Sequence, residues 1–334
     1  MEGIGRQWIA VLCALGVAAC HKPQPDPDPT PSAKASAELT ESATPSAEAP
    51  PSSAPPSASV APAATAEAPS APDPKRYAWL ADDTLKYPKA VTTLNQRFPP
   101  PPSYERLPVK PGSFGEWLRG LPLTAPGTPV LSYKGEELVA GDNQYLGAVV
   151  AIDVGTNDLQ TSSDMVLRLN AEWKFSTDQD IEYKSATGLE LPFSRWLAGD
   201  RLKAAGAAVA WVRNAKAAEK SHQQLRAFMD QVYTWANSTS LISHTESVAP
   251  EDIQPGDFLI HSKKPSHVVI LLDIAKNSKG KLVALLGRSL NPAQSFHVLR
   301  LGLNESWYNI DPQSESLLTP GTVPFPWSNL RRVR

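Results

Sequence analysis

Apolar residues recur at helical spacing in two segments in the middle of the chain. In the first segment, one stripe of a helix would carry Leu159, Ser162, Val166, Leu169 and Trp173. In the second segment, the corresponding stripe is Leu225, Phe228, Met229, Val232 and Trp235. The pattern predicts a helix over 158–175, capped by Asp158, and an amphipathic helix over 221–239. Ser162 is thereby expected on the inward face of the first helix, near its N-terminus.

The last third of the chain changes to apolar runs of strand length. These runs are "GDFLIH", "HVVILLDIA", "KLVALLGRSL" and "FHVLRL", separated by the turn-forming segments "SKKPS", "KNSKG" and "NPAQS". They predict an antiparallel β-meander. If the hairpin is centred between Asn277 and Ser278, His267 lies directly opposite Arg288 on the same face of the sheet. The expected fold class is therefore α+β, with helices packed on an antiparallel meander.

Shorter patterns precede the meander. "SFGEWLRGLPL" predicts a short helix that stops before a proline, and "AVVAIDV", residues 148–154, predicts a buried strand. "LPFSRWL" is typical of a short helix or an irregular segment.

The N-terminal residues have the pattern of a secretory signal. Arg6 precedes the apolar run "WIAVLCALGVAA", which is too short to span a bilayer and stay there. Residues 17–20, "VAAC", are similar to the lipobox of bacterial lipoproteins. That resemblance implies a signal peptide over 1–19 and a lipid-modified Cys20 as the mature N-terminus; the alternative is an ordinary signal peptide. Cys13 and Cys20 are the only cysteines, so the mature chain would have no thiol for cysteine catalysis.

Residues 20–75 are dominated by Pro, Ala, Ser, Thr and Glu, as in "PSSAPPSASVAPAATAEAPSAP". Such a segment buries too little apolar surface to offset the chain entropy lost on folding, so we expect an extended tether. Aromatic residues begin at Tyr77 and Trp79 and continue to the C-terminus. The pattern predicts one globular domain over 76–334, held away from a membrane by the tether.

Charge and ligand spacing exclude several classes of function. The formal net charge is −2 and the pI is near 6.3, which leaves no basic footprint for nucleic acid and no polybasic patch for anionic lipid. His261 and His267 flank a predicted turn, but no third ligand stands at metal-binding spacing and "HExxH" is absent. We therefore predict no nucleic-acid partner, no metal and no cofactor.

The order of the candidate polar residues resembles that of papain-like hydrolases of the NlpC type. Ser162 stands at a helix start, His267 opens a strand about a hundred residues later, and Arg288 lies on the next strand. In those enzymes a cysteine at the helix start is activated by the helix dipole and by a histidine on the facing strand. A third polar group on the neighbouring strand orients the histidine.

A more specific resemblance covers about 240 residues from about Arg97 onward. The matching stretches are "RFPPPPSYERLP", "GSFGEWLRGLPL", "DLQTSSDMVLRLNAEW", "IQPGDFLI", "SHVVILLDIA" and "LNPAQSFHVL". They resemble a bacterial secreted and lipoprotein family known as a domain of unknown function (4846). The resemblance implies that the family cysteine falls on Ser162, its histidine on His267 and its strand glutamine on Arg288. Asp164, Arg168, Ser289 and Gln294 match the family pattern unchanged, and the resemblance implies that Asp164, Arg168 and Ser289 support the site.

Two of the three candidate catalytic positions depart from this pattern, and both departures are chemically unfavourable. A serine hydroxyl depends on an oriented base more than a thiol does. Arg288 has only donors, so it cannot accept from the far N–H of His267, and its charge would lower the pKa of the imidazole. Asp164 and Arg168 stand four residues apart, which predicts a salt bridge on the helix.

Three functions remain open from the sequence. The first is a cell-envelope lipoprotein, at the outer membrane or the periplasmic face, whose degenerate papain-like domain binds a peptide or a peptidoglycan-type ligand. The second is a serine-variant amidase, peptidase or esterase that uses Ser162 and His267. The third is a purely structural lipoprotein with no concave pocket near His267.

Overall fold

The computed structural model describes residues 71–261 and 266–334. The predicted signal peptide, Cys20, the tether up to residue 70 and most of the turn "SKKPS" lie outside the described residues. Inside the domain, the side chains of Tyr77 and Trp79 are completely buried. The indole of Trp79 donates to the carbonyl of Ala151 at 2.6 Å, which ties the start of the described chain to the core.

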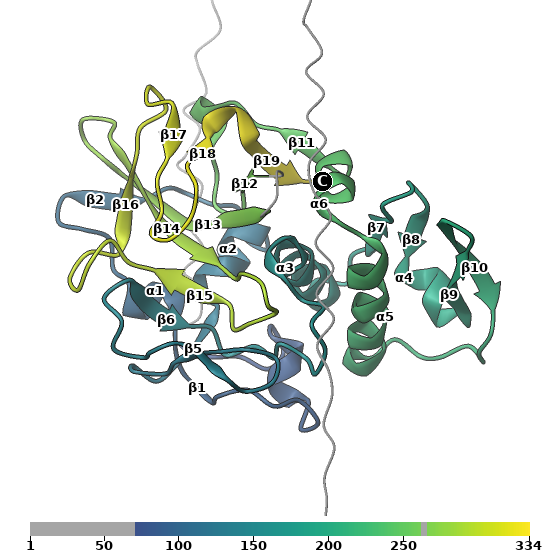
Figure 1. The fold of residues 1–334 in the computed structure, drawn as a ribbon. Coiled ribbons are helices and arrows are strands. Elements are labelled where there is room, and N and C mark those ends of the chain that lie inside the picture. The colour runs from purple at the N-terminus through teal and green to yellow at the C-terminus, as the bar shows by residue number, and fades with distance from the viewer. Residues whose placement is uncertain (1–70, 262–265) are drawn as a thin grey trace, which may run out of the picture. The chain divides into compact units, whose positions relative to one another are not determined.

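The main body is a mixed α+β fold built on an antiparallel sheet, in agreement with the expected class. The strands run in the order β11-β19-β12-β13-β14-β15-β6, and β16 and β2 pair with β14 and β13 (Figure 1). Their bounds are β11 Thr245–Ser247, β19 Leu330–Val333, β12 Phe258–His261, β13 His267–Asn277, β14 Leu282–Arg288, β15 His297–Leu299, β6 Leu146–Val149, β16 Trp307–Ile310 and β2 Tyr104–Arg106. The neighbouring strands β12 to β15 are the predicted meander.

Helices and two-stranded sheets surround this body. The α-helices are α1 Leu94–Arg97, α2 Phe114–Arg119, α3 Ser162–Ser176, α4 Phe193–Leu197, α5 His222–Trp235 and α6 Ser238–Ser243; the 3-10 helices are η1 Ala78–Ala81, η2 Pro250–Asp252 and η3 Trp327–Asn329. The strand pairs are β1 Ala90–Thr93 with β3 Pro122–Thr124, β4 Val130–Leu131 with β5 Glu137–Val139, β7 Glu182–Lys184 with β8 Glu190–Pro192, β9 Asp200–Ala205 with β10 Ala208–Arg213, and β17 Ser316–Leu317 with β18 Phe325–Pro326. No helix within 71–261 or 266–334 is long and apolar enough to cross a membrane.

The central sheet is buried on both faces, each against a different part of the chain. Side chains alternate between the faces along a strand. On β13, Val268 and Ile270 join the core that contains the inward residues of α3. Val269 and Leu271 join a second core, closed by β17, β18 and η3. This alternation decides which polar groups at the start of β13 can meet α3.

Both long helices form where the apolar stripes predict them, with different ends. The first begins at Ser162 rather than at residue 158, because the N-cap is Thr161. The carboxylate of Asp158 instead accepts from the backbone N–H of Ala293 at 2.7 Å. The second predicted helix divides at the extended residue Ala236, and Asn237 caps the separate helix α6.

The predicted strand over 148–154 is shifted toward the N-terminus. Only residues up to Val149 pair in β6, while 150–153 stay buried outside the ladder. The short helix predicted in "SFGEWLRGLPL" is α2, where the hydroxyl of Ser113 accepts from the N–H of Glu116 at 3.3 Å.

The predicted register of the main hairpin is wrong. The turn is closed by a bond from the N–H of Asn277 to the carbonyl of Lys281, and a bulge follows between Leu271 and Asp273. The last registered pair is Ile270 with Gly287. Continuing that ladder puts Val269, not His267, opposite Arg288. The longer turn and the bulge together displace the strands by two places.

Candidate functional site

Ser162 is the first residue of α3 and lies beside the start of β13. Its hydroxyl oxygen accepts a hydrogen bond from the backbone N–H of Val268 at 2.8 Å. The residue is 5% exposed. The sequence-based expectation that this helix start meets the strand opened by His267 is therefore confirmed, and the contact is made through the strand backbone.

His267 shares its strand end with Ser162 but belongs to the other face of the sheet. By alternation its side chain lies on the face of Val269, which packs in the second core. In the sheet, it lies opposite His261 on the neighbouring strand β12. Its Nδ1 is buried and has no hydrogen-bond partner in the described part of the chain. Burial, with the nearby His261 and Arg288, lowers the pKa of His267.

Arg288 lies near His267 on that same face. Its Nη1 donates to the carbonyl of Pro320 at 2.6 Å. In the sheet, Arg288 on β14 lies opposite His297 on β15. Burial and the charge of Arg288 lower the pKa of His297 to about 4, although a bond to the Ser295 carbonyl acts in the opposite direction. The structure thus groups His267 with Arg288 and leaves Ser162 on the helix side.

Asp164 stabilises the start of α3. Its carboxylate accepts from the hydroxyl of Thr161 at 2.8 Å and from the backbone N–H of Thr161 at 3.2 Å. Burial raises the pKa of Asp164 to about 7, against the two bonds from Thr161, which favour the charged form. Because the carboxylate points back to the cap, the predicted salt bridge with Arg168 is wrong.

Arg168 forms a different network and is completely buried. Its guanidinium donates to Glu172 at 2.7 Å, to Gln160 at 2.8 Å and to Asp153 at 2.7 Å. Burial opposes the ionisation of Asp153, but Arg168 and Arg226 outweigh it and hold the pKa of this carboxyl well below its usual range.

The network continues from α3 to α5 and to the N-terminal part of the domain. The Nε2 of His222 lies 2.9 Å from Glu172, and its Nδ1 lies 3.3 Å from Asp82. Sequence reasoning missed this network. One signal was available, because Arg168 and Glu172 stand at i,i+4 spacing within the predicted helix.

Ser289, matched to the family pattern, is almost fully buried at the end of β14. Its hydroxyl has no hydrogen-bond partner among residues 71–261 and 266–334. The same residues contain no group of three or more His, Cys, Asp or Glu side chains arranged to hold a metal ion.

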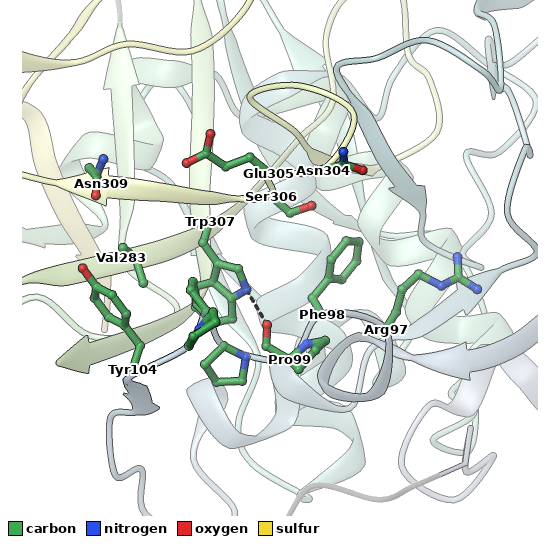
Figure 2. A pocket seen from close by; sticks show the side chains of 13 residues that line it. Arg97, Phe98, Pro99, Tyr104, Val283, Asn304, Glu305, Ser306, Trp307 and Asn309 are labelled. Carbon is green, nitrogen blue, oxygen red and sulfur yellow. Dashed lines mark hydrogen bonds between the residues drawn. The ribbon is translucent and has the colours of Figure 1, made fainter.

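A pocket of about 520 Å³ lies elsewhere on the domain, where the segment 97–104 crosses β14 and β16 (Figure 2). We call it the Arg97–Trp307 pocket. Its lining consists of Arg97, Phe98, Pro99, Pro100, Pro101, Pro102, Tyr104, Val283, Asn304, Glu305, Ser306, Trp307 and Asn309. The sequence pointed to this site only through the motif "RFPPPPSYERLP", whose residues form one wall.

The residue types along the chain also match a family model. The model named domain of unknown function (4846) matches residues 94–332, which is more than half of the chain. The chain belongs to this family. Membership of domain of unknown function 4846 is thus confirmed, with a start at Leu94 rather than Arg97. Comparison with curated proteins and with solved structures found no match.

Proposed function

We propose that this protein is a cell-envelope lipoprotein whose folded domain binds a peptide or a peptidoglycan-type ligand without efficient catalysis. A lipid on Cys20 would anchor it to the outer membrane or to the periplasmic face, and residues 20–75 would give the domain reach. The lipobox-like "VAAC" after a short apolar run supports the anchor.

A relation to papain-like (NlpC-like) domains is part of the proposal. It is supported by a helix whose N-terminus contacts the first residues of a central strand, followed by an antiparallel meander. In a degenerate domain of this kind, the cysteine position is held by Ser162 and the strand glutamine position by Arg288.

One observation carries the non-catalytic part of the proposal. The hydroxyl of Ser162 accepts from the Val268 N–H, while His267 lies on the opposite face of β13. A serine nucleophile needs a general base within hydrogen-bond reach of its own proton. No hydrogen bond joins these two side chains in the part of the chain that the structure describes.

The test is turnover of peptidoglycan fragments and of a simple ester by the purified full chain. We expect no turnover by wild type, and a thiol of ordinary alkylation rate in Ser162→Cys, because no imidazole contacts position 162. The matched control is Ser163→Cys, one residue further along the same helix. Turnover that is lost in Ser162→Ala but kept in Ser163→Ala would establish the serine-variant amidase, peptidase or esterase instead.

The anchor is tested separately. Cys20→Ala should move the protein from the membrane fraction to the soluble fraction or stall its processing, while Cys13→Ala should change neither. A mature N-terminus without lipid in mass spectrometry contradicts the lipoprotein assignment and leaves the binding function to be judged on its own.

A further inference from the structure

The walls of the Arg97–Trp307 pocket are rigid. Four consecutive prolines, residues 99–102, have fixed φ angles and no N–H donors. The indole of Trp307 donates to the carbonyl of Pro99 at 2.9 Å, which fastens the proline segment to β16 (Figure 2). A site held in one shape loses little entropy when a ligand enters. The pocket volume of about 520 Å³ also falls in the usual range for small ligands.

Arg106 holds the segment that precedes the prolines. Its guanidinium donates to Asp273 at 2.6 Å and to the carbonyl of Phe98 at 2.8 Å. The same guanidinium carbon lies 6.0 Å from the ring centroid of Trp307. The Nε and Nη2 of Arg106 are therefore engaged by the protein, and the residue does not line the pocket.

Arg97 is in the opposite situation. Its guanidinium lines the pocket and makes no hydrogen bond or ion pair to any residue that the structure describes. Burial, and the positive charge of the nearby Arg300, lower the pKa of Arg97. The Nε of Arg300 is itself buried without a partner among the described residues. Both side chains are only partly buried, and an anion that joins Arg97 from outside offsets the repulsion between the two positive charges.

The remaining polar groups restrict what the anion can be. Figure 2 shows Arg97 at one end, Tyr104 at the other, and Glu305 away from Arg97. A carboxylate at Glu305 repels a multiply charged phosphate or a polyanion. Carbonyls of the proline wall and the amide of Asn309 can accept N–H groups. A ligand with one negative end and several N–H donors fits this distribution best.

We propose that the Arg97–Trp307 pocket binds the free carboxylate end of a short peptide, with Arg97 engaging the carboxylate. Guanidinium groups match a carboxylate with paired N–H donors, and chain-terminal carboxylates are a recurring feature of peptide recognition. The apolar rings of Pro99–Pro102 and Phe98 enclose the residue next to the carboxylate. This assignment rests on the proposed binding function and gives it a location.

The experiment measures binding of two probes, tri-alanine with a free carboxylate and tri-alanine amide, to the purified full chain. We expect the acid to bind about tenfold more tightly than the amide, because the amide loses the charge-assisted bonds. Arg97→Gln should bind both probes equally and weakly. Lys203→Gln, which removes one positive charge from the distant hairpin β9–β10, should keep the wild-type preference.

Two results would overturn the assignment. If wild type binds the acid and the amide equally, or binds neither, the pocket does not recognise a peptide carboxylate. If inorganic phosphate displaces the acid at the same concentration as unlabelled peptide does, the pocket is a general anion site instead.

Cosedimentation of the same proteins with insoluble peptidoglycan separates this inference from the proposed function. If the protein cosediments with peptidoglycan but shows no preference for the peptide acid, the pocket assignment is wrong and the proposed binding function still holds. If the protein hydrolyses peptidoglycan and the activity depends on Ser162, the proposed non-catalytic function is wrong. The preference for the peptide acid is then measured on the inactive variant Ser162→Ala.

Discussion

Two regions of this domain contain polar residues that match the family pattern. In one region these residues have partners within the protein, and in the other the charged residue has none among the described residues. At the contact between α3 and β13, the groups that contact one another are Ser162 with Val268, Asp164 with Thr161, and Arg168 with three partners. In the Arg97–Trp307 pocket, Arg97 lines a cavity and pairs with nothing that the structure describes.

The difference teaches how to separate a polar residue that serves the fold from one that serves a ligand. A buried charge is tolerated when the protein itself supplies its partners, and removing one partner then destabilises the fold. A charge that borders a cavity without a partner costs stability until a ligand arrives. Arg168 and Arg97 belong to the same residue type, so comparing them isolates this effect.

The largest expected effect is the contrast between these two arginines. Arg168→Met removes three buried bonds and leaves Asp153 and Glu172 short of a partner, so we expect a loss of about 3–5 kcal/mol in the free energy of unfolding. Arg97→Met should change it by only about 0.5 kcal/mol in either direction. Denaturant unfolding of the two variants measures both. Equal losses would mean that Arg97 is a structural residue and would remove the contrast.

A smaller effect is expected at the helix start. Ser162→Ala leaves the buried N–H of Val268 without its acceptor and should cost about 1–3 kcal/mol. Ser163→Ala is the matched control, because no hydrogen bond of its hydroxyl is recorded in residues 71–261 and 266–334, and it should be nearly neutral. Thermal unfolding of both variants is the measurement. A more stable Ser162→Ala would instead be typical of an active-site residue.

The last effect depends on pH and is small for any single pH unit. Burial raises the pKa of Asp164 from 3.8 to about 7, so between these values the folded chain holds a proton that the unfolded chain has released. Stability therefore falls as pH rises through this window, by at most about 1.4 kcal/mol per pH unit.

Asp164→Asn, which can still accept from Thr161, should remove that slope, whereas Asp83→Asn at an exposed position should not. Urea unfolding at several pH values between 4 and 7 provides the comparison. A wild-type slope of the opposite sign would show that the bonds from Thr161 outweigh burial.

Much of the fold was predictable because it follows from local periodicity. The stripes that contain Val166 and Val232 form α3 and α5, and the four strand-length runs form β12 to β15. The predicted ends of helices were wrong where another segment of the chain binds the side chain that was expected to cap the helix. Asp158, a good cap by residue type, binds the N–H of Ala293 more than a hundred residues away. The hairpins β7–β8 and β9–β10 were missed because most positions in their strands are exposed or only partly buried, so the strands lack the apolar alternation of a core strand.

The candidate site was predictable to the level of neighbouring elements. Sequence order and family resemblance bring the residue at the helix start, Ser162, to the strand opened by His267, and the structure agrees. They do not determine the face on which an imidazole lies, since one place in register reverses it. The pocket was missed because its charged residue, Arg97, ends the four-residue helix α1 directly before the proline segment, and neither part is long enough to show a helix or strand periodicity.

The sequence by itself determined what local pattern and composition control: the two long helices, the meander, the absence of a basic footprint, and family membership through the residue types along 94–332. Only the tertiary structure decided which polar groups are partners. Arg168 could have paired with Asp164 four residues earlier, yet it binds Glu172, Gln160 and Asp153. The physical reason is that a buried charge selects among all groups that packing brings within 3 Å, and packing is a property of the whole chain.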